Sequence, residues 1–212
     1  MTESVIKQQL REQMPVAKTL AYFDHAAVAP LPSVAAQAIT SWLEEATNQG
    51  DLYWPKWAKR VEIIRRNAAK LIGASAEEIA LTPNTSTGIN FVAEGFPWKE
   101  GENIVTFANE FPSNLYPWMN LHSRGVNTRV VPVEQGIAEI NRLFEACDEQ
   151  TRLISLSWVS FSSGYRFTNE QLHEIVQEAH RRGIYVMLDA IPVSYTHLRA
   201  HETVLDLVCR LL

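Results

Sequence analysis

Residues 183–189 read Gly-Ile-Tyr-Val-Met-Leu-Asp, a short apolar run that ends on a carboxylate. A run of this length and composition predicts a buried β-strand. In open α/β sheets, ligands bind at the carboxyl ends of the strands. Asp189 is therefore a candidate metal ligand, ribose-binding acid or partner for a ring nitrogen. A helix cap is the commoner role of a single Asp, so the assignment of a site depends on other residues.

The rest of the chain predicts the sheet to which this strand belongs. Apolar spacing and turn residues predict strands at residues 79–82, 103–107, 128–133, 153–158 and 185–188. Helices are expected at residues 2–14 with Thr2 as N-cap, 33–47, 57–71, 86–94, 113–123 with a kink at Pro117, 137–147 and 169–182. Gly50 and Gly73 end two of these helices, and Ser75 with Glu78 forms a capping-box pattern. Alternating strands and helices indicate an α/β fold with a mostly parallel sheet and helices on both faces.

Composition narrows the class of protein. The 212 residues are 46% hydrophobic and 20% charged, which is ordinary for a globular chain. The formal charge of −5 and the lack of a Lys/Arg block exclude nucleic acid as a main partner. The polar N-terminus has no signal-peptide core, and no apolar run is long enough to span a membrane. These features predict a soluble cytoplasmic protein.

The strongest candidate for a ligand site besides Asp189 is the segment at residues 82–90, Thr-Pro-Asn-Thr-Ser-Thr-Gly-Ile-Asn. It joins a predicted strand to a predicted helix, where free backbone N–H groups and the positive end of the helix dipole attract anions. The hydroxyl groups of Thr85, Ser86 and Thr87 complete a candidate phosphate cradle. An ordinary N-cap remains the alternative, and the segment is neither a Walker loop nor a Gly-x-Gly-x-x-Gly motif.

Two more strand ends carry suitable side chains. Phe111, in residues 109–118, could stack on a flat ring, although a buried core position is the alternative. Residues 157–166 run from the end of a predicted strand into a loop that is rich in hydroxyl groups and contains a glycine, although loops are polar in general. Because all these segments follow predicted strands, we expect them to converge with Asp189 on one crevice.

Taken in chain order, these segments at the strand ends resemble those of the class V aminotransferase family. This family of fold-type I enzymes includes cysteine desulfurases and isopenicillin-N-epimerase-like proteins. Residues 22–32, Tyr-Phe-Asp-His-Ala-Ala-Val-Ala-Pro-Leu-Pro, also look like that family's N-terminal motif. The resemblance covers about residues 20–191. It implies a pyridoxal 5′-phosphate cofactor, a small amino-acid substrate and a parent protein that is a homodimer.

The resemblance also implies roles for individual residues. Thr85 and Ser86 match the family's phosphate-binding positions, with the Thr87 amide nearby. Phe111 matches the residue that stacks on the pyridine ring. Asp189 matches the acid that keeps the pyridine nitrogen protonated, so that the ring works as an electron sink.

Several positions depart from the family pattern. Desulfurases usually have His at the position of Phe111 and commonly Asn at that of Phe161, and Pro192 stands where the family has a Gln. The family's Schiff-base lysine lies a few tens of residues beyond the Asp, whereas the last of the six lysines here is Lys99. We therefore expect a fragment of a pyridoxal-phosphate-dependent enzyme that is inactive as given, with no catalytic residue assigned.

Residues 193–212 resemble translated sequencing-adapter DNA, a peptide that recurs at the ends of unrelated translations. We accordingly expect three parts: residues 1–78 as an N-terminal helical segment, 79–191 as a partial α/β large domain that binds the cofactor, and 192–212 as a non-native tail.

Four other interpretations compete with this one. His197 and His201 could share a helix face beside Glu202, but two ligands do not close a metal site, so no metal is expected. Cys147 could suggest a desulfurase nucleophile, but a free Cys near a helix end is usually a small buried hydrophobe. Finally, the chain could be a non-catalytic α/β module that binds a phosphorylated ligand through residues 85–88, or an unstable fragment without function.

Overall fold

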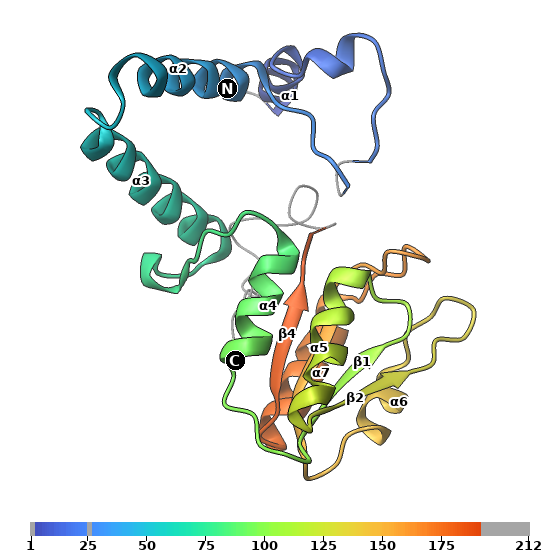
Figure 1. Cartoon of the computed structure of the whole chain (residues 1–212). Coiled ribbons are helices and arrows are strands. Elements are labelled where there is room, and N and C mark those ends of the chain that lie inside the picture. Colours follow the sequence, from blue (N-terminus) through green and yellow to red (C-terminus); the bar gives the residue numbers. More distant parts are fainter. Residues whose placement is uncertain (1–2, 25–26, 192–212) are drawn as a thin grey trace. The chain divides into compact units, whose positions relative to one another are not determined.

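The computed structural model describes residues 3–24 and 27–191 (Figure 1). The expectations for Thr2, Pro192, the histidine pair and the tail lie outside these residues. The chain divides into two compact units, Met1–Ile64 and Arg65–Leu212, and the boundary falls within helix α3 (Trp54–Ile72). Along the described residues, no helix combines the length and apolar character that crossing a membrane requires.

The first unit is helical. It contains α1 (Glu3–Glu12), the 3₁₀ turn η1 (Pro15–Lys18), α2 (Ser33–Gln49) and the start of α3. Gly50 ends α2 with a φ of 59°, which confirms the predicted stop. The indole of Trp57 on α3 donates to Glu45 on α2 over 2.8 Å and packs edge-on against Trp42.

The second unit is built on a parallel sheet. Its strands are β1 (Asn103–Phe107), β2 (Asn127–Val131), β3 (Thr151–Ser157) and β4 (Tyr185–Asp189), in the order β2-β1-β3-β4. All three strand pairs are parallel. The fold class is therefore confirmed: an α/β fold with a parallel sheet.

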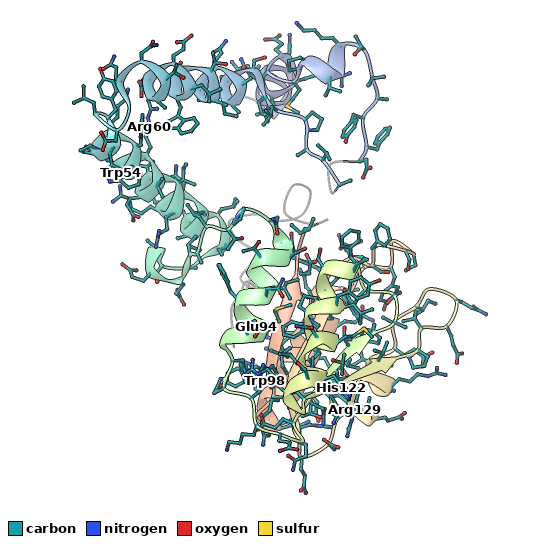
Figure 2. The ribbon with its side chains drawn as sticks, in the orientation of Figure 1. Trp54, Arg60, Glu94, Trp98, His122 and Arg129 are labelled. Atoms are coloured by element: carbon teal, nitrogen blue, oxygen red, sulfur yellow. The ribbon has the colours of Figure 1, made fainter. Side chains whose placement is uncertain are left out.

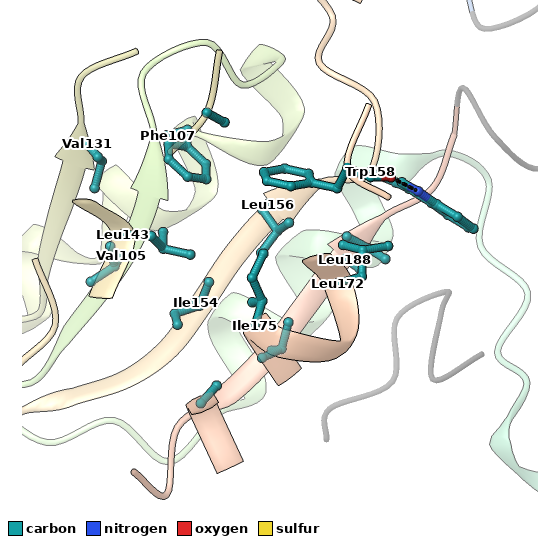
Figure 3. Packing of buried hydrophobic residues seen from close by; sticks show 14 of the residues in the cluster. Val105, Phe107, Val131, Leu143, Ile154, Leu156, Trp158, Leu172, Ile175 and Leu188 are labelled. Carbon is teal, nitrogen blue, oxygen red and sulfur yellow. Dashed lines mark hydrogen bonds between the residues drawn. The ribbon is translucent and has the colours of Figure 1, made fainter. Parts of the chain in front are cut away.

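Helices α6 (Ile140–Glu145) and α7 (Asn169–Arg181) cover one face of the sheet (Figure 3). On this side Ile154 and Leu156 of β3 pack with Leu143 of α6 and with Leu172 and Ile175 of α7. The side chains alternate along each strand, so every second residue of β3 and β4 points into this core.

Helices α4 (Thr85–Gly95) and α5 (Tyr116–Asn120), with the 3₁₀ turn η4 (Leu121–Arg124), cover the other face. Ile89 of α4 and Trp118 of α5 pack against Leu153 of β3 and Met187 of β4. Trp98 lies beyond the last turn of α4 (Figure 2). Its indole N–H donates to the carbonyl of Ala93 over 2.8 Å. Helices therefore cover both faces, as predicted.

Three local predictions are wrong. Residues 79–82 form no strand. A strand requires backbone hydrogen bonds to a neighbouring strand, and this segment does not pair with any strand of the described sheet. Residues 113–123 form no single kinked helix. They fold as η3 (Pro112–Asn114), α5 and η4, with Pro117 in the first turn of α5, where its missing N–H costs nothing.

The third wrong prediction is the helix at residues 137–147, which begins only at Ile140. Glu134 and Ile137 form an antiparallel bridge around Gln135 and Gly136, whose φ angles of 51° and 78° are not helical.

Candidate functional site

The sheet has a topological switch point between β1 and β3. The connection after β1 leads to β2 through α5, whereas the connection after β3 leads to β4 through α7 on the opposite face. Such a point, at the carboxyl ends of the strands, is the usual place for a ligand in an open α/β sheet. The loops at residues 108–115 and 158–168 flank it. The first contains the predicted site residue Phe111, and the second overlaps the candidate loop at residues 157–166.

The start of α4 lies at the same end of the sheet (Figure 1). Asn84 is the N-cap, and its side-chain oxygen accepts from the backbone N–H and the hydroxyl of Thr87, over 2.9 and 3.0 Å. The cap is therefore Asn84 rather than a Thr or Ser. Because Asn84 holds Thr87, an anion at the Thr87 amide would have to displace the cap, whereas the cap leaves Thr85 and Ser86 to other contacts.

Ser86 connects this helix start to the loop after β1. Its hydroxyl oxygen lies 2.8 Å from that of Ser113, two residues beyond Phe111. Phe111 is 43% exposed, and its ring meets that of Phe161 at 76°, with 4.9 Å between the ring centroids. The loop that carries Phe111 is thus joined to the helix start through Ser113, and the aromatic partner of Phe111 comes from the loop after β3.

Asp189 lies at the carboxyl end of β4, in register with Ser157 of β3. Because side chains alternate along a strand, Asp189 points to the same face as Met187, the face that α4 and α5 cover. Its carboxylate accepts from the backbone N–H of Ile191 over 2.9 Å. Burial raises the pKa of the Asp189 carboxyl, and the hydrogen bond from Ile191 opposes this rise.

The site combines three chemical features. Hydroxyl groups at a helix N-terminus suit a phosphate. An exposed aromatic ring suits a flat ring, and a largely buried carboxylate suits a cation. None of the ion pairs in the described part of the chain includes Asp189, so a positively charged ligand atom would give this carboxylate a charged partner besides the Ile191 amide.

Sequence reasoning missed two polar residues of the loop after β1. Glu110 bonds to Ser157, and the fully buried Asn114 bonds to Ser155. The signal for Glu110 was a charged residue placed soon after a fully buried strand. No pattern in the sequence distinguishes Asn114 from an ordinary turn residue.

Cys147 lies away from this site. It precedes β3 and therefore belongs to the amino end of the sheet, opposite Asp189. Its thiol donates to the carbonyl of Leu143 over 3.3 Å, and burial raises its pKa to about 11. A protonated, half-buried thiol of this kind supports the interpretation of Cys147 as a packing residue.

Comparisons with known proteins identify relatives of the chain. The family profile described as Aminotransferase class-V matches residues 21–199. A probable cysteine desulfurase of Methanothermobacter thermautotrophicus is 32% identical over 188 residues, which are 86% of this chain and 46% of that protein. A cysteine desulfurase of Escherichia coli O139:H28 is 33% identical, over 88% of this chain and 48% of its own.

A solved structure of a C-DES mutant, with glycine covalently linked to its PLP cofactor, matches with a TM-score of 0.76. The identity is 24%, and the match covers 89% of this chain and 53% of that one. The chain thus spans about half the length of the proteins that it resembles.

Proposed function

The chain belongs to the class V aminotransferase family, and we propose that its α/β unit binds pyridoxal 5′-phosphate and that its parent enzyme acts on a small amino acid. The observation that carries this proposal is the contact between Ser86 and Ser113. It joins the candidate phosphate cradle to the loop of Phe111 at the edge of the sheet where Asp189 lies.

The helix start would bind the phosphate of the cofactor, and the loop after β1 would contact its ring. Thr85 and Ser86, at the first two positions of α4, would hold the phosphate with hydroxyl and backbone N–H groups. Thr87 would add its amide only if the phosphate displaced the side chain of Asn84. Phe111 would cover one face of the pyridine ring, with Phe161 against the ring of Phe111.

Asp189 would orient the ring from its other end. Its carboxylate would accept a hydrogen bond from the protonated pyridine nitrogen, and the positive charge would favour the ionised carboxylate despite its burial. When bound, pyridoxal 5′-phosphate supplies an electron sink for a carbanion at the substrate carbon.

The positions of the lysines in the sequence support the idea that this chain does not attach the cofactor covalently. None of its six lysines follows Lys99, and Lys99 lies four residues before the start of β1, at the end of the sheet opposite Asp189. We infer that this chain binds the cofactor without a covalent bond and does not turn over amino acids, since covalent catalysis through a lysine needs its amine at the site.

The experiment that tests the proposal combines three readouts on the 212-residue chain. Equilibrium dialysis with pyridoxal 5′-phosphate should show one molecule retained per chain. Borohydride reduction followed by peptide mapping should find no stoichiometric adduct on any lysine, and cysteine should not be consumed. Cysteine is the first substrate to test, because the similar proteins are named cysteine desulfurases. A stoichiometric adduct with turnover would contradict the inference about inactivity.

One alternative uses the same helix start. A non-catalytic module for a phosphorylated ligand would need Thr85 and Ser86 but not Asp189. Asp189→Asn decides between the two: it should weaken the binding of a phosphorylated pyridine under our proposal and leave it unchanged under the alternative.

A further inference from the structure

A buried polar network lies beneath the candidate site, and Glu110 is its centre. One carboxylate oxygen of Glu110 accepts from the backbone N–H of Ser157 over 2.8 Å. The other oxygen accepts from the hydroxyl of Ser157 and from the side-chain amide of Asn114, the latter over 2.9 Å. Three donors therefore converge on one carboxylate, next to the strand position that pairs with Asp189.

Asn114 carries the network further into the fold. Its side-chain oxygen accepts from the hydroxyl of Ser155 over 2.6 Å and from the indole N–H of Trp118 over 3.3 Å. Asn114, Ser155 and Trp118 are completely buried. The network thus fastens residues 110–118, which include Phe111 and Ser113, to two positions of β3.

The N–H groups of this network fix the direction of the bond between Asn114 and residue 110. The backbone N–H of Ser157 and the indole N–H of Trp118 can only donate. Asn114 must therefore turn its oxygen toward Trp118 and its NH₂ group toward residue 110. Residue 110 then has to accept at both ends, and an ionised carboxylate does so while a side-chain amide does not.

We propose that Glu110 is a positioning residue, whose carboxylate holds the loop of Phe111 and Ser113 in the place where these residues meet the ligand. The part that concerns the ligand rests on the proposed function. Burial raises the pKa of the Glu110 carboxyl, the hydrogen bonds from Ser157 and Asn114 oppose the rise, and the charge of Asp189 adds to it. Burying the Glu110 carboxylate is thus energetically unfavourable, and the hydrogen bonds of the network offset this cost.

The proposal is tested by exchanging the carboxylate of Glu110 and the side-chain amide of Asn114. In Glu110→Gln, the introduced NH₂ group faces the NH₂ group of Asn114, and one hydrogen bond is lost. Adding Asn114→Asp restores the bond between positions 110 and 114, because the new carboxylate accepts from position 110, from Ser155 and from Trp118, while the Ser157 hydroxyl turns to accept from the introduced amide at position 110. The net charge of E110Q/N114D equals that of the wild type. Glu149→Gln, at an exposed position at the amino end of the sheet, is the matched control for loss of a charge.

Two measurements compare these variants with the wild type, each as the full chain. Hydrogen–deuterium exchange measures the protection of the backbone amides at residues 110–118. Titration with pyridoxamine 5′-phosphate, which has no aldehyde to react with lysines, measures binding. We expect E110Q to exchange faster in this peptide and to bind about tenfold more weakly, the effect of one lost hydrogen bond. E110Q/N114D should regain the protection and bind within about threefold of the wild type.

The outcomes separate this proposal from the proposed function. Unchanged exchange in E110Q, or no recovery in a folded E110Q/N114D variant, would overturn the positioning role. If the wild type fails to bind pyridoxamine 5′-phosphate, the proposed function is contradicted, and the exchange data still decide whether Glu110 holds the loop. If E110Q does not fold, Ser157→Ala replaces it, because it removes a single donor, and unchanged exchange there overturns the proposal.

Discussion

The hydroxyl oxygens of Ser86 and Ser113 lie 2.8 Å apart, although 27 residues separate them in the chain. Ser86 is the second residue of α4, and Ser113 lies in η3, after β1. The contact ties the helix start that suits a phosphate to the loop that presents Phe111. The phosphate and the ring of one ligand would therefore meet residues whose relative position this hydrogen bond helps to fix.

Ser86→Ala tests the phosphate end of the site. We expect pyridoxamine 5′-phosphate to bind about tenfold more weakly, because one hydroxyl contact to a charged group is lost, while unphosphorylated pyridoxamine binds as before. Titration calorimetry measures both affinities. Ser123→Ala, at an exposed position of η4, is the control and should change neither. An equal loss for both ligands would show that Ser86 acts on the fold rather than on the phosphate.

Asp189 predicts a pH dependence of stability. Its folded pKa is raised by burial above the value of about 4 for an unfolded Asp. Its contribution to stability is therefore fully present below about pH 4 and is lost as the pH rises through the folded pKa. Asp189→Asn removes this titration. Urea unfolding between pH 4 and 8 should show the variant gaining stability relative to the wild type as the pH rises. A difference that stays constant with pH contradicts the burial of this carboxylate.

At the amino end of the sheet, Asp148 predicts a pH dependence of stability with the opposite sign to that of Asp189. Hydrogen bonds from Asn103 and Arg129 lower its pKa to about 2. The stability that it contributes is present above the unfolded value of about 4 and is lost as the pH falls through the folded pKa. Asp148→Asn should therefore unfold at acid pH with a shallower pH dependence than the wild type, as followed by circular dichroism. A steeper acid dependence in the variant would be incompatible with this assignment.

Core substitutions test the packing of the sheet. Ile154 is completely buried in the middle of β3, so Ile154→Ala should lower the free energy of unfolding by about 2–5 kcal/mol through lost burial and a cavity. Val130→Ala, at a 41% exposed position of the edge strand β2, should cost less than about 1 kcal/mol. Urea unfolding measures both values. Similar losses at the two positions would contradict the placement of β3 in the core.

The sequence predicted those parts of the fold that local patterns determine. Helix α7 has a clear apolar stripe and a capping box at Thr168 and Gln171, and its predicted range differs from the observed one only at the last residue. Strands β1 and β4 were similarly clear because their apolar runs are short and bounded. By contrast, residues 79–82 have strand composition but no strand in the described sheet, and pairing is not a local property.

The candidate site shows the same division. Asp189, Phe111 and Ser86 follow or begin elements that the sequence revealed, so their common edge could be predicted. Glu110 could not be assigned from the sequence, because its role depends on Ser157, which is 47 residues away. Long-range hydrogen bonds of this kind leave no periodic signal in the chain.

The most direct test of the ligand site is a titration of the 212-residue chain with pyridoxamine 5′-phosphate, in parallel with the double variant S86A/D189N. We expect the wild type to bind one molecule per chain. The double variant should bind at least about a hundredfold more weakly at unchanged secondary structure, because the losses at two separate contacts add. A wild type that binds nothing, or a double variant that binds as tightly as the wild type, would contradict the assignment of Ser86 and Asp189 to a pyridoxal-phosphate site.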